Sequence, residues 1–327
     1  AGKSFGWVYY KGFDGPADAH MNAYGGEDRL WLGPEGGKYS LFFKPGTKMI
    51  FDEWHTPPAI DTESWTKETQ TQQSVHMSKA ASLLNYAGTT LEMRLERTVE
   101  ILPKANVEEA LGITIKEGVN EVGFKTVNTI VNMGKEEWNE KSGMPCLWSL
   151  DMFNPSEQCI IVIPYNEASG KIATTDYFGE IPGDRIKMQD GILYFKADGK
   201  SRGKLGLPPA RAKNVAGSYD ATANVLTINK YDVNASGKYL NQEWNTDKPV
   251  FSGDAMNAYN DGPLEDGSQM GPFYELESVS PAAALKPGQK LTHHHSVFHF
   301  EGDKTSLNEI SKKALGVSLQ EIEDSLK

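Results

Sequence analysis

Hydrophobic and polar residues alternate along much of the chain, most regularly between Thr90 and Leu102. Because successive side chains of a β-strand point to opposite faces of a sheet, this segment is expected to be a strand with one buried and one wet face. The apolar side consists of Leu91, Met93, Leu95, Val99 and Ile101.

Further segments have the length and composition of strands, and turn pairs such as Asn154-Pro155 and Asp190-Gly191 separate them. The 32 glycines and 17 prolines break the chain at short intervals, which is typical of an all-β sandwich. The additional strands are expected at Glu121–Val131, Glu157–Ile163, Gly191–Ala197 and Val225–Tyr231.

Helix is expected in two places. One is a short segment near Ser78–Tyr86, and the other is the C-terminus, which has the pattern of two helices separated by Gly316. Sequences typical of a capping box begin at Ser306 and at Ser318. We therefore expect one domain over residues 1–327, with a sandwich at 1–302 and a packed helical tail at 303–327.

Composition narrows the classes of partner. The net charge is -11, whereas nucleic-acid binding needs a concentrated cationic surface, so no nucleic-acid partner is expected. The longest apolar run is Cys159–Ile163, far short of the roughly 20 residues of a membrane span. Cys146 and Cys159 are the two cysteines, and we expect two buried small side chains, with a disulfide between them as the alternative for an exported protein.

The stretch from Gly271 to Gly302 concentrates the side chains best suited to proton transfer. Glu275 and Glu277 share one face of an expected strand, since residues two apart point the same way. A turn follows, and His293, His295 and His299 then share one face of the next strand. A catalytic or binding site is therefore expected here.

This stretch also resembles a known superfamily. Leu276-Glu277-Ser278, followed by Leu285-Lys286-Pro287-Gly288 and a strand through His293, resembles the C-terminal end of the aldose 1-epimerase (galactose mutarotase) superfamily. The chain is similar to a family of exported bacterial proteins with that β-supersandwich fold and no settled activity. The supporting blocks are GGEDRLWLGPEGG (Gly25–Gly37), VNTIVNMG (Val127–Gly134), LWSLDMF (Leu147–Phe153) and GDAMNAYNDGP (Gly253–Pro263).

The resemblance implies a galactose mutarotase-like supersandwich and a role for Glu277 as the base that takes a proton from an anomeric hydroxyl. The superfamily's acid is a histidine, and the matching position here is Thr129, whose hydroxyl is not a competent general acid. The replacement acid could come from His20, from His55 or from the strand with His293, His295 and His299, called the histidine strand below. The alternative role for Glu277 is a structural carboxylate paired with an arginine such as Arg29.

If the protein is an enzyme, we expect Glu277 as the base and His293 or His295 as the acid. The like charge of the nearby Glu275 is expected to adjust the pKa of Glu277. His299 is expected in the same sugar pocket, with ordinary strand hydrogen bonds as the alternative for these histidines. A metal shared by all three is not expected, because the face of a strand holds His293 and His299 some 20 Å apart. His294 lies on the opposite face and is expected to pack against apolar neighbours.

Two further segments offer ligand contacts. In the first, Asp28 and Arg29 present an acceptor and a forked donor, Trp31 presents a stacking face, and Glu35 follows. The alternative there is a tight hairpin held by a structural Asp–Arg pair. In the second segment, Asn257, Tyr259 and Asn260 are expected to contact sugar, while the spacing of a calcium-binding loop is missing.

The sequence as a whole predicts recognition of a carbohydrate in a concave pocket, with aldose 1-epimerase-like chemistry as the further expectation. The alternative is a non-catalytic glycan-binding or scaffold module, which Thr129 favours. We expect no cofactor and no metal, and the oligomeric state is not indicated. The chain begins at Ala1 rather than Met, which fits a mature form with its leader removed, so a periplasmic or extracellular location is expected, mainly from the resemblance.

Overall fold

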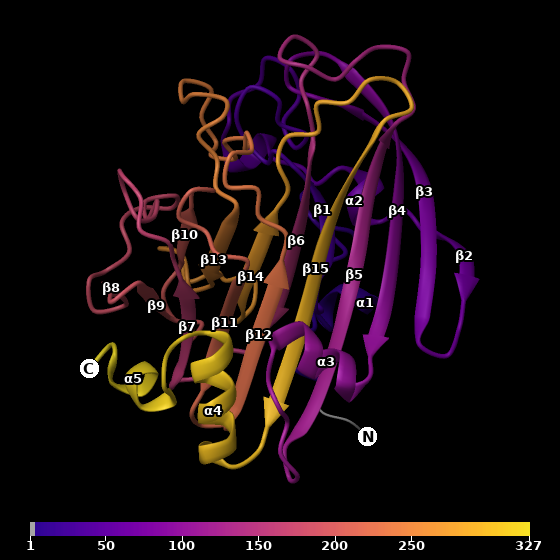
Figure 1. Cartoon of the computed structure of the whole chain (residues 1–327). Coiled ribbons are helices and arrows are strands. Elements are labelled where there is room, and N and C mark those ends of the chain that lie inside the picture. The colour runs from indigo at the N-terminus through magenta and orange to yellow at the C-terminus, as the bar shows by residue number, and fades with distance from the viewer. Residues whose placement is uncertain (1–3) are drawn as a thin grey trace.

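Two antiparallel β-sheets, packed face to face, make up most of the computed structural model, which describes residues 4–327 (Figure 1). The smaller sheet has five strands in the order β1-β6-β14-β13-β10, and each neighbouring pair is antiparallel. Its strands are β1 (Arg29–Gly33), β6 (Cys146–Phe153), β14 (Tyr274–Val279), β13 (Met256–Asn260) and β10 (Gly203–Leu207).

The larger sheet has ten strands in the order β2-β3-β4-β5-β15-β12-β11-β7-β9-β8. The histidine strand is β15, which lies near the middle of this order and pairs with β5 along its whole length. The strands are β2 (Thr66–Gln70), β3 (Ser74–Leu84), β4 (Thr90–Leu102), β5 (Asn120–Asn132), β15 (Lys290–Glu301), β12 (Val225–Tyr231), β11 (Val215–Asp220), β7 (Cys159–Pro164), β9 (Ile192–Lys196) and β8 (Ile186–Gln189).

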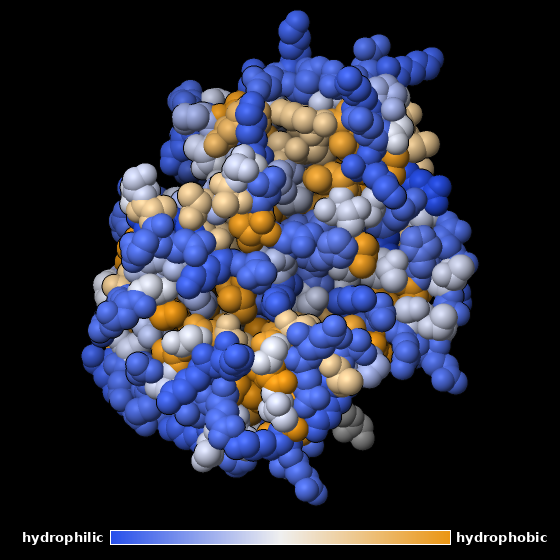
Figure 2. Space-filling view, in the orientation of Figure 1, coloured by the Kyte–Doolittle hydropathy of each residue, from blue (hydrophilic) through white to orange (hydrophobic). Residues whose placement is uncertain are grey.

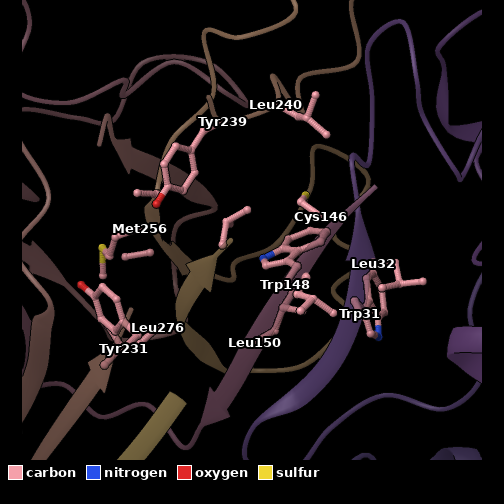
Figure 3. Close-up of a cluster of buried hydrophobic side chains, with 14 of the residues drawn as sticks. Trp31, Leu32, Cys146, Trp148, Leu150, Tyr231, Tyr239, Leu240, Met256 and Leu276 are labelled. Atoms are coloured by element: carbon pink, nitrogen blue, oxygen red, sulfur yellow. The ribbon is translucent and has the colours of Figure 1, made fainter. Parts of the chain in front are cut away.

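The main hydrophobic core lies between the two sheets. Leu91, Met93 and Leu95 of β4 are each 1% exposed, as their alternation with charged residues predicts. From the five-stranded sheet, Leu276 of β14 and Met256 of β13 belong to the same core (Figure 3). This burial is the principal source of stability for the sandwich.

A second core lies under the helices on the outer face of the ten-stranded sheet. Figure 1 shows α3 (Lys104–Leu111) and α4 (Lys304–Ala314) lying across the strands, with α5 (Leu319–Asp324) beside them. Phe298 and Phe300 of β15 pack there against residues of the three helices. Outside these helices, hydrophilic residues cover much of the face in Figure 2. The short helices are α1 (Lys11–Asp14), η1 (Phe51–Glu53) and α2 (Pro58–Asp61).

The structure therefore confirms the expected all-β sandwich with a short C-terminal helical tail. Strand β4 has the expected bounds, and the other expected strands are present within a few residues. The expected helix near Ser78–Tyr86 is wrong, because Ser74–Leu84 is strand β3, paired with β4 along its whole length. Its Ala and Leu residues favour helix locally, but pairing and the burial of Ala81 and Leu83 prevail.

Two expectations for the C-terminal part need correction. Helix α4 begins three residues earlier than expected and is capped by Asp303, whose side chain accepts from the Ser306 backbone N–H, whereas the expected capping box at Ser318 is present. His294 does not pack against apolar neighbours. Its side chain is 58% exposed, and its Nδ1 lies 2.8 Å from Asp232 Oδ2.

Candidate functional site

A cavity of about 640 Å³ lies against the face of the five-stranded sheet that points away from the ten-stranded sheet. A smaller extension of about 110 Å³ shares many of its residues and lies directly on the strands. Strand side chains form the floor, and loops carrying Phe51, Trp54, Phe178 and Trp244 form the walls. The floor residues are Arg29 and Trp31 of β1, Trp148 and Leu150 of β6, Lys204 of β10, Asn257 and Tyr259 of β13, and Glu275 of β14.

Glu277 lies beneath this floor, fully buried, on the same face of β14 as Glu275. Its Oε2 accepts hydrogen bonds from Trp148 Nε1 at 2.9 Å and from Lys204 Nζ at 3.0 Å. Its Oε1 is buried and has no hydrogen-bond partner among residues 4–327. Buried polar atoms are seldom left unpaired, so this oxygen is an unusual feature of the site.

Glu275 contacts a different cation, because its Oε1 accepts from Arg29 Nη2 at 2.8 Å. Burial, and then the charge of Glu277, raise the pKa of Glu275 to about 8, and they outweigh the opposing charges of Arg29 and Lys204. Nε and Nη1 of Arg29 are buried and have no partner in the described part of the chain. The two neighbouring carboxyl groups thus have different hydrogen-bond partners.

Lys204 supplies the positive charge next to Glu277. Burial disfavours its ammonium form, but the carboxylates of Glu277, Glu35 and Glu275 outweigh burial and raise its pKa. Its Nζ also lies 4.8 Å from the centre of the Trp148 ring, a distance suited to a cation–π interaction. Lys204 therefore stays charged across the neutral pH range and holds Glu277 in place.

The structure brings five other expected residues to the cavity. Arg29, Trp31, Glu35, Asn257 and Tyr259 all line it or its extension. The guanidinium carbon of Arg29 lies 4.8 Å from the centre of the Trp31 ring, so that ring is partly covered within the floor. Burial raises the pKa of Glu35, against the charge of Lys204. The strand alternation in β1 and β13 accounts for this convergence.

The histidine strand does not reach the cavity. His293 and His295 are each 1% exposed and point into the space between the sheets, where Ser278 Oγ lies 2.8 Å from His293 Nε2 and from His295 Nδ1. Because Ser278 and Glu277 are consecutive in β14, they project from opposite faces, so the five-stranded sheet separates these histidines from Glu277. The expectation that one of them shares a pocket with Glu277 does not agree with this placement.

Two other expected contacts, His299 and Asn260, also lie elsewhere. His299 is buried between Thr227 Oγ1, at 2.9 Å from its Nδ1, and Glu27 Oε2, at 2.9 Å from its Nε2. The side-chain amide of Asn260 is hydrogen-bonded to nearby backbone groups. Its Oδ1 accepts from the Gly199 N–H, and its Nδ2 donates to the carbonyls of Ser201 and Asp261. In both cases the side chain projects from its strand away from the cavity.

Asp28 is part of a polar network between the sheets. Its Oδ2 lies 3.3 Å from Arg97 Nη2 and accepts from Thr126 Oγ1 at 2.5 Å. Nearby, His295 Nε2 lies 2.8 Å from Asp151 Oδ2. Burial opposes the charged form of His295, but the carboxylates of Asp151 and Asp28 outweigh it and raise the pKa of His295. Asp28 is therefore a structural carboxylate, but the alternative of an Asp–Arg pair within its own hairpin is wrong, because Asp28 pairs with Arg97 of β4 and Arg29 pairs with Glu275.

The same network contains the atoms that a metal ion would need. One potential ligand atom from each of Asp28, Asp151 and His295 lies within 4.8 Å of the other two. Arg97 and His295 already provide two cationic groups for these two carboxylates, so their charges are matched without an ion. The group is therefore best described as a buried ion-pair network.

Thr129 lies in the ten-stranded sheet and is hydrogen-bonded to Thr292, with 2.8 Å between their hydroxyl oxygens.

His20 lines the cavity next to Phe51, and its Nδ1 lies 2.6 Å from the Trp54 carbonyl oxygen. That contact places the Nδ1 proton toward the carbonyl and leaves Nε2 for other partners. His20 was one of the expected sources of a replacement acid.

Sequence reasoning missed several cavity residues. Tyr177 donates to Asp254 Oδ2 at 2.5 Å and accepts from Asn257 Nδ2 at 3.3 Å, and burial raises the pKa of Asp254 to about 7. Tyr177 is in a long connecting loop with no local pattern to identify it. Lys204, in contrast, is a charged residue inside the short strand sequence Gly203–Leu207, which is a signal that could have been used.

The cysteines are as expected for two buried small side chains. Cys146 and Cys159 are free and buried, and no disulfide joins them. Burial raises the pKa of Cys146 to about 12, so its thiol stays neutral and unreactive at neutral pH.

Comparison with known proteins identifies the family to which the chain belongs. The chain belongs to the family described as "Family of unknown function (DUF6786)", whose model matches residues 1–326. No similar sequence was found among curated proteins. No helix among residues 4–327 is long and apolar enough to cross a bilayer.

Solved structures with a similar fold include a protein from Synechocystis sp. PCC 6803, at 13% identity and a TM-score of 0.49, covering 86% of this chain and 79% of that one. A galactose mutarotase-like protein from Lactobacillus casei is 12% identical with a TM-score of 0.47, over 83% of this chain and 84% of that one. A galactose mutarotase related enzyme from Lactobacillus acidophilus is 9% identical with a TM-score of 0.44, over 83% and 82%. The expected similarity to galactose mutarotase-like structures is confirmed, and it is a similarity of fold.

Proposed function

We propose that the protein binds a carbohydrate in the cavity on the five-stranded sheet and interconverts its anomers in the manner of an aldose 1-epimerase. The observation that carries this proposal is the position of Glu277, a buried carboxylate beneath the cavity floor. Lys204 and Trp148 hold one of its oxygens, and the other has no hydrogen-bond partner among residues 4–327. The aromatic walls and the polar floor are what sugar recognition requires, with ring faces that stack and groups that bond to hydroxyls.

The chemistry would need a base and an acid on neighbouring oxygens. Glu277 takes the proton from the anomeric hydroxyl while Glu275, in its protonated form, gives a proton to the ring oxygen, and the bond between the anomeric carbon and the ring oxygen breaks. Rotation and the reverse transfers then close the ring as the other anomer. The pKa of Glu275, raised to about 8, supports its role as the acid near neutral pH.

A second candidate is a binding module without catalysis. It is favoured by the placement of His293 and His295 behind the sheet and by the hydrogen bond that occupies Thr129. In that case the cavity would hold a sugar, and neither Glu275 nor Glu277 would transfer a proton.

The test is proton NMR of anomeric signals for a panel of monosaccharides and uronic acids, with and without protein. Faster exchange between anomers that is abolished in Glu277→Gln supports the epimerase, with Glu117→Gln, an exposed position, as the matched control. Selective broadening of one sugar without faster exchange supports the binding module. If no sugar broadens or exchanges faster, the proposal of a monosaccharide site is wrong.

A further inference from the structure

The mouth of the cavity is lined by large apolar side chains that are exposed to water. Phe51 is 58% exposed, Phe178 37%, Leu264 46% and Met270 41%, and all four line the cavity. They come from η1 and from the loops before β8 and β14, so distant parts of the chain converge here. Exposed apolar patches of this kind are typical of ligand grooves.

The strand residues of the floor and the exposed apolar residues of the mouth offer different groups to a ligand. The floor offers charged and amide groups, such as Arg29, Lys204 and Asn257, to hydroxyls. At the mouth, Leu264 and Met270 have neither an aromatic face for a sugar ring nor a group that hydrogen-bonds strongly to a hydroxyl. A bare monosaccharide on the floor would leave them in water, because a cavity of about 640 Å³ is large enough for a drug-sized ligand.

Arg202 lies between these two regions. It lines both the main cavity and the extension, and its guanidinium carbon is 3.9 Å from the centre of the Phe178 ring. Its Nε is buried and has no hydrogen-bond partner among residues 4–327. A buried unpaired donor suits an acceptor oxygen of a ligand, and the carbonyl oxygen of an ester that joins a sugar to an apolar group is one such acceptor.

We propose that the ligand is a reducing sugar esterified with an aryl or acyl group at a hydroxyl other than the anomeric one. This inference rests on the proposed function, which requires a free anomeric hydroxyl above Glu277. The sugar ring lies on the floor, the ester carbonyl accepts from Arg202 Nε, and the apolar group fills the mouth against Leu264 and Met270.

Calorimetric and NMR titrations test this with D-glucose and D-galactose, their 6-O-benzoyl and 6-O-octanoyl esters, and the two-ring sugars maltose and lactose. We expect at least one ester to bind about tenfold or more tightly than its parent sugar, because it removes apolar surface from water. In Leu264→Ala/Met270→Ala the ratio of ester affinity to parent-sugar affinity should fall to about one. Leu84→Ala/Ile101→Ala, two equally exposed apolar positions on the other sheet, keeps the gain.

The outcomes separate the two proposals. If the parent sugars bind and the esters bind no more tightly, the inference is wrong and the proposed function stands. A two-ring sugar that binds more tightly than every ester also overturns it, in favour of an oligosaccharide. If neither sugars nor esters bind, the proposed function itself fails.

Discussion

Glu275 and Glu277 project from the same face of β14, yet each contacts its own cation, Arg29 at 2.8 Å and Lys204 at 3.0 Å. Two carboxyl groups so close together would repel each other if both were charged and unpartnered. Burial, and then the charge of Glu277, raise the pKa of Glu275, whereas Glu277 is held by Lys204 and Trp148. The proposed function assigns the acid and the base to these two carboxyl groups on the strength of this difference.

The first prediction concerns Lys204. In Lys204→Met the carboxylate of Glu277 is buried without its cation, so the free energy of unfolding should fall by about 3–5 kcal/mol. Urea denaturation measures this loss, and anomeric exchange should be lost as well. In the double variant Lys204→Met/Glu277→Gln most of the stability should return, since no charge is left unpaired. If the single variant is as stable as the wild type, the pair does not hold Glu277.

The second prediction concerns pH. The unfolded chain ionises Glu275 near pH 4.5, whereas the folded protein keeps its proton up to about pH 8. The folded state therefore binds more protons in this window, and stability should fall as pH rises from 4.5 to 8, by up to about 5 kcal/mol.

Chemical denaturation of the wild type and Glu275→Gln at several pH values checks this. The variant should show a flatter dependence over the window, since its amide does not titrate. The exposed variant Glu117→Gln should keep the wild-type slope. An equal slope in the wild type and Glu275→Gln would show that Glu275 is ionised in the folded protein.

The third prediction compares two arginines of β4. Arg97 is buried and paired with Asp28 between the sheets, whereas Arg94 is 46% exposed and lies 3.2 Å from Glu96. Arg97→Met should cost about 3–5 kcal/mol of unfolding free energy, and Arg94→Met about 0–1 kcal/mol. Sugar binding by the folded fraction should be unchanged in both. Equal losses would mean that the buried pair contributes no more than a surface pair.

The strands were predictable because alternation is a local property of the sequence. Thr90–Leu102 shows it, and β4 has those bounds. The parity of β14 likewise placed Glu275 and Glu277 together. The segment Ser78–Leu84 was not predictable as a strand, since its helix-favouring Ala and Leu residues become β3 only through pairing with β4.

It was harder to predict which face of each strand lies toward the cavity and which lies toward the opposite sheet. The shared face of His293, His295 and His299 is correct, but alternation cannot tell whether a buried face meets a ligand cavity or the opposite sheet. Arg97 carried a usable signal, because it interrupts the apolar side of β4 and buries a charge that needs a partner. Its partner Asp28 lies 69 residues away and follows only from the fold.

The last prediction identifies the acid. If Glu275 donates the proton to the ring oxygen, Glu275→Gln should lower the rate of anomeric exchange by about 10²–10⁴-fold, the usual contribution of a general acid. His20→Asn should change the rate much less, because the His20 ring lies 4.3 Å from the ring of Phe51 at the mouth and does not line the extension on the floor. His295→Asn should reduce stability, through the loss of its bond to Asp151, without changing exchange by the folded protein. A large loss of exchange in His20→Asn together with near-normal exchange in Glu275→Gln would assign the acid to His20, with the histidine delivered from a loop instead of from the sheet.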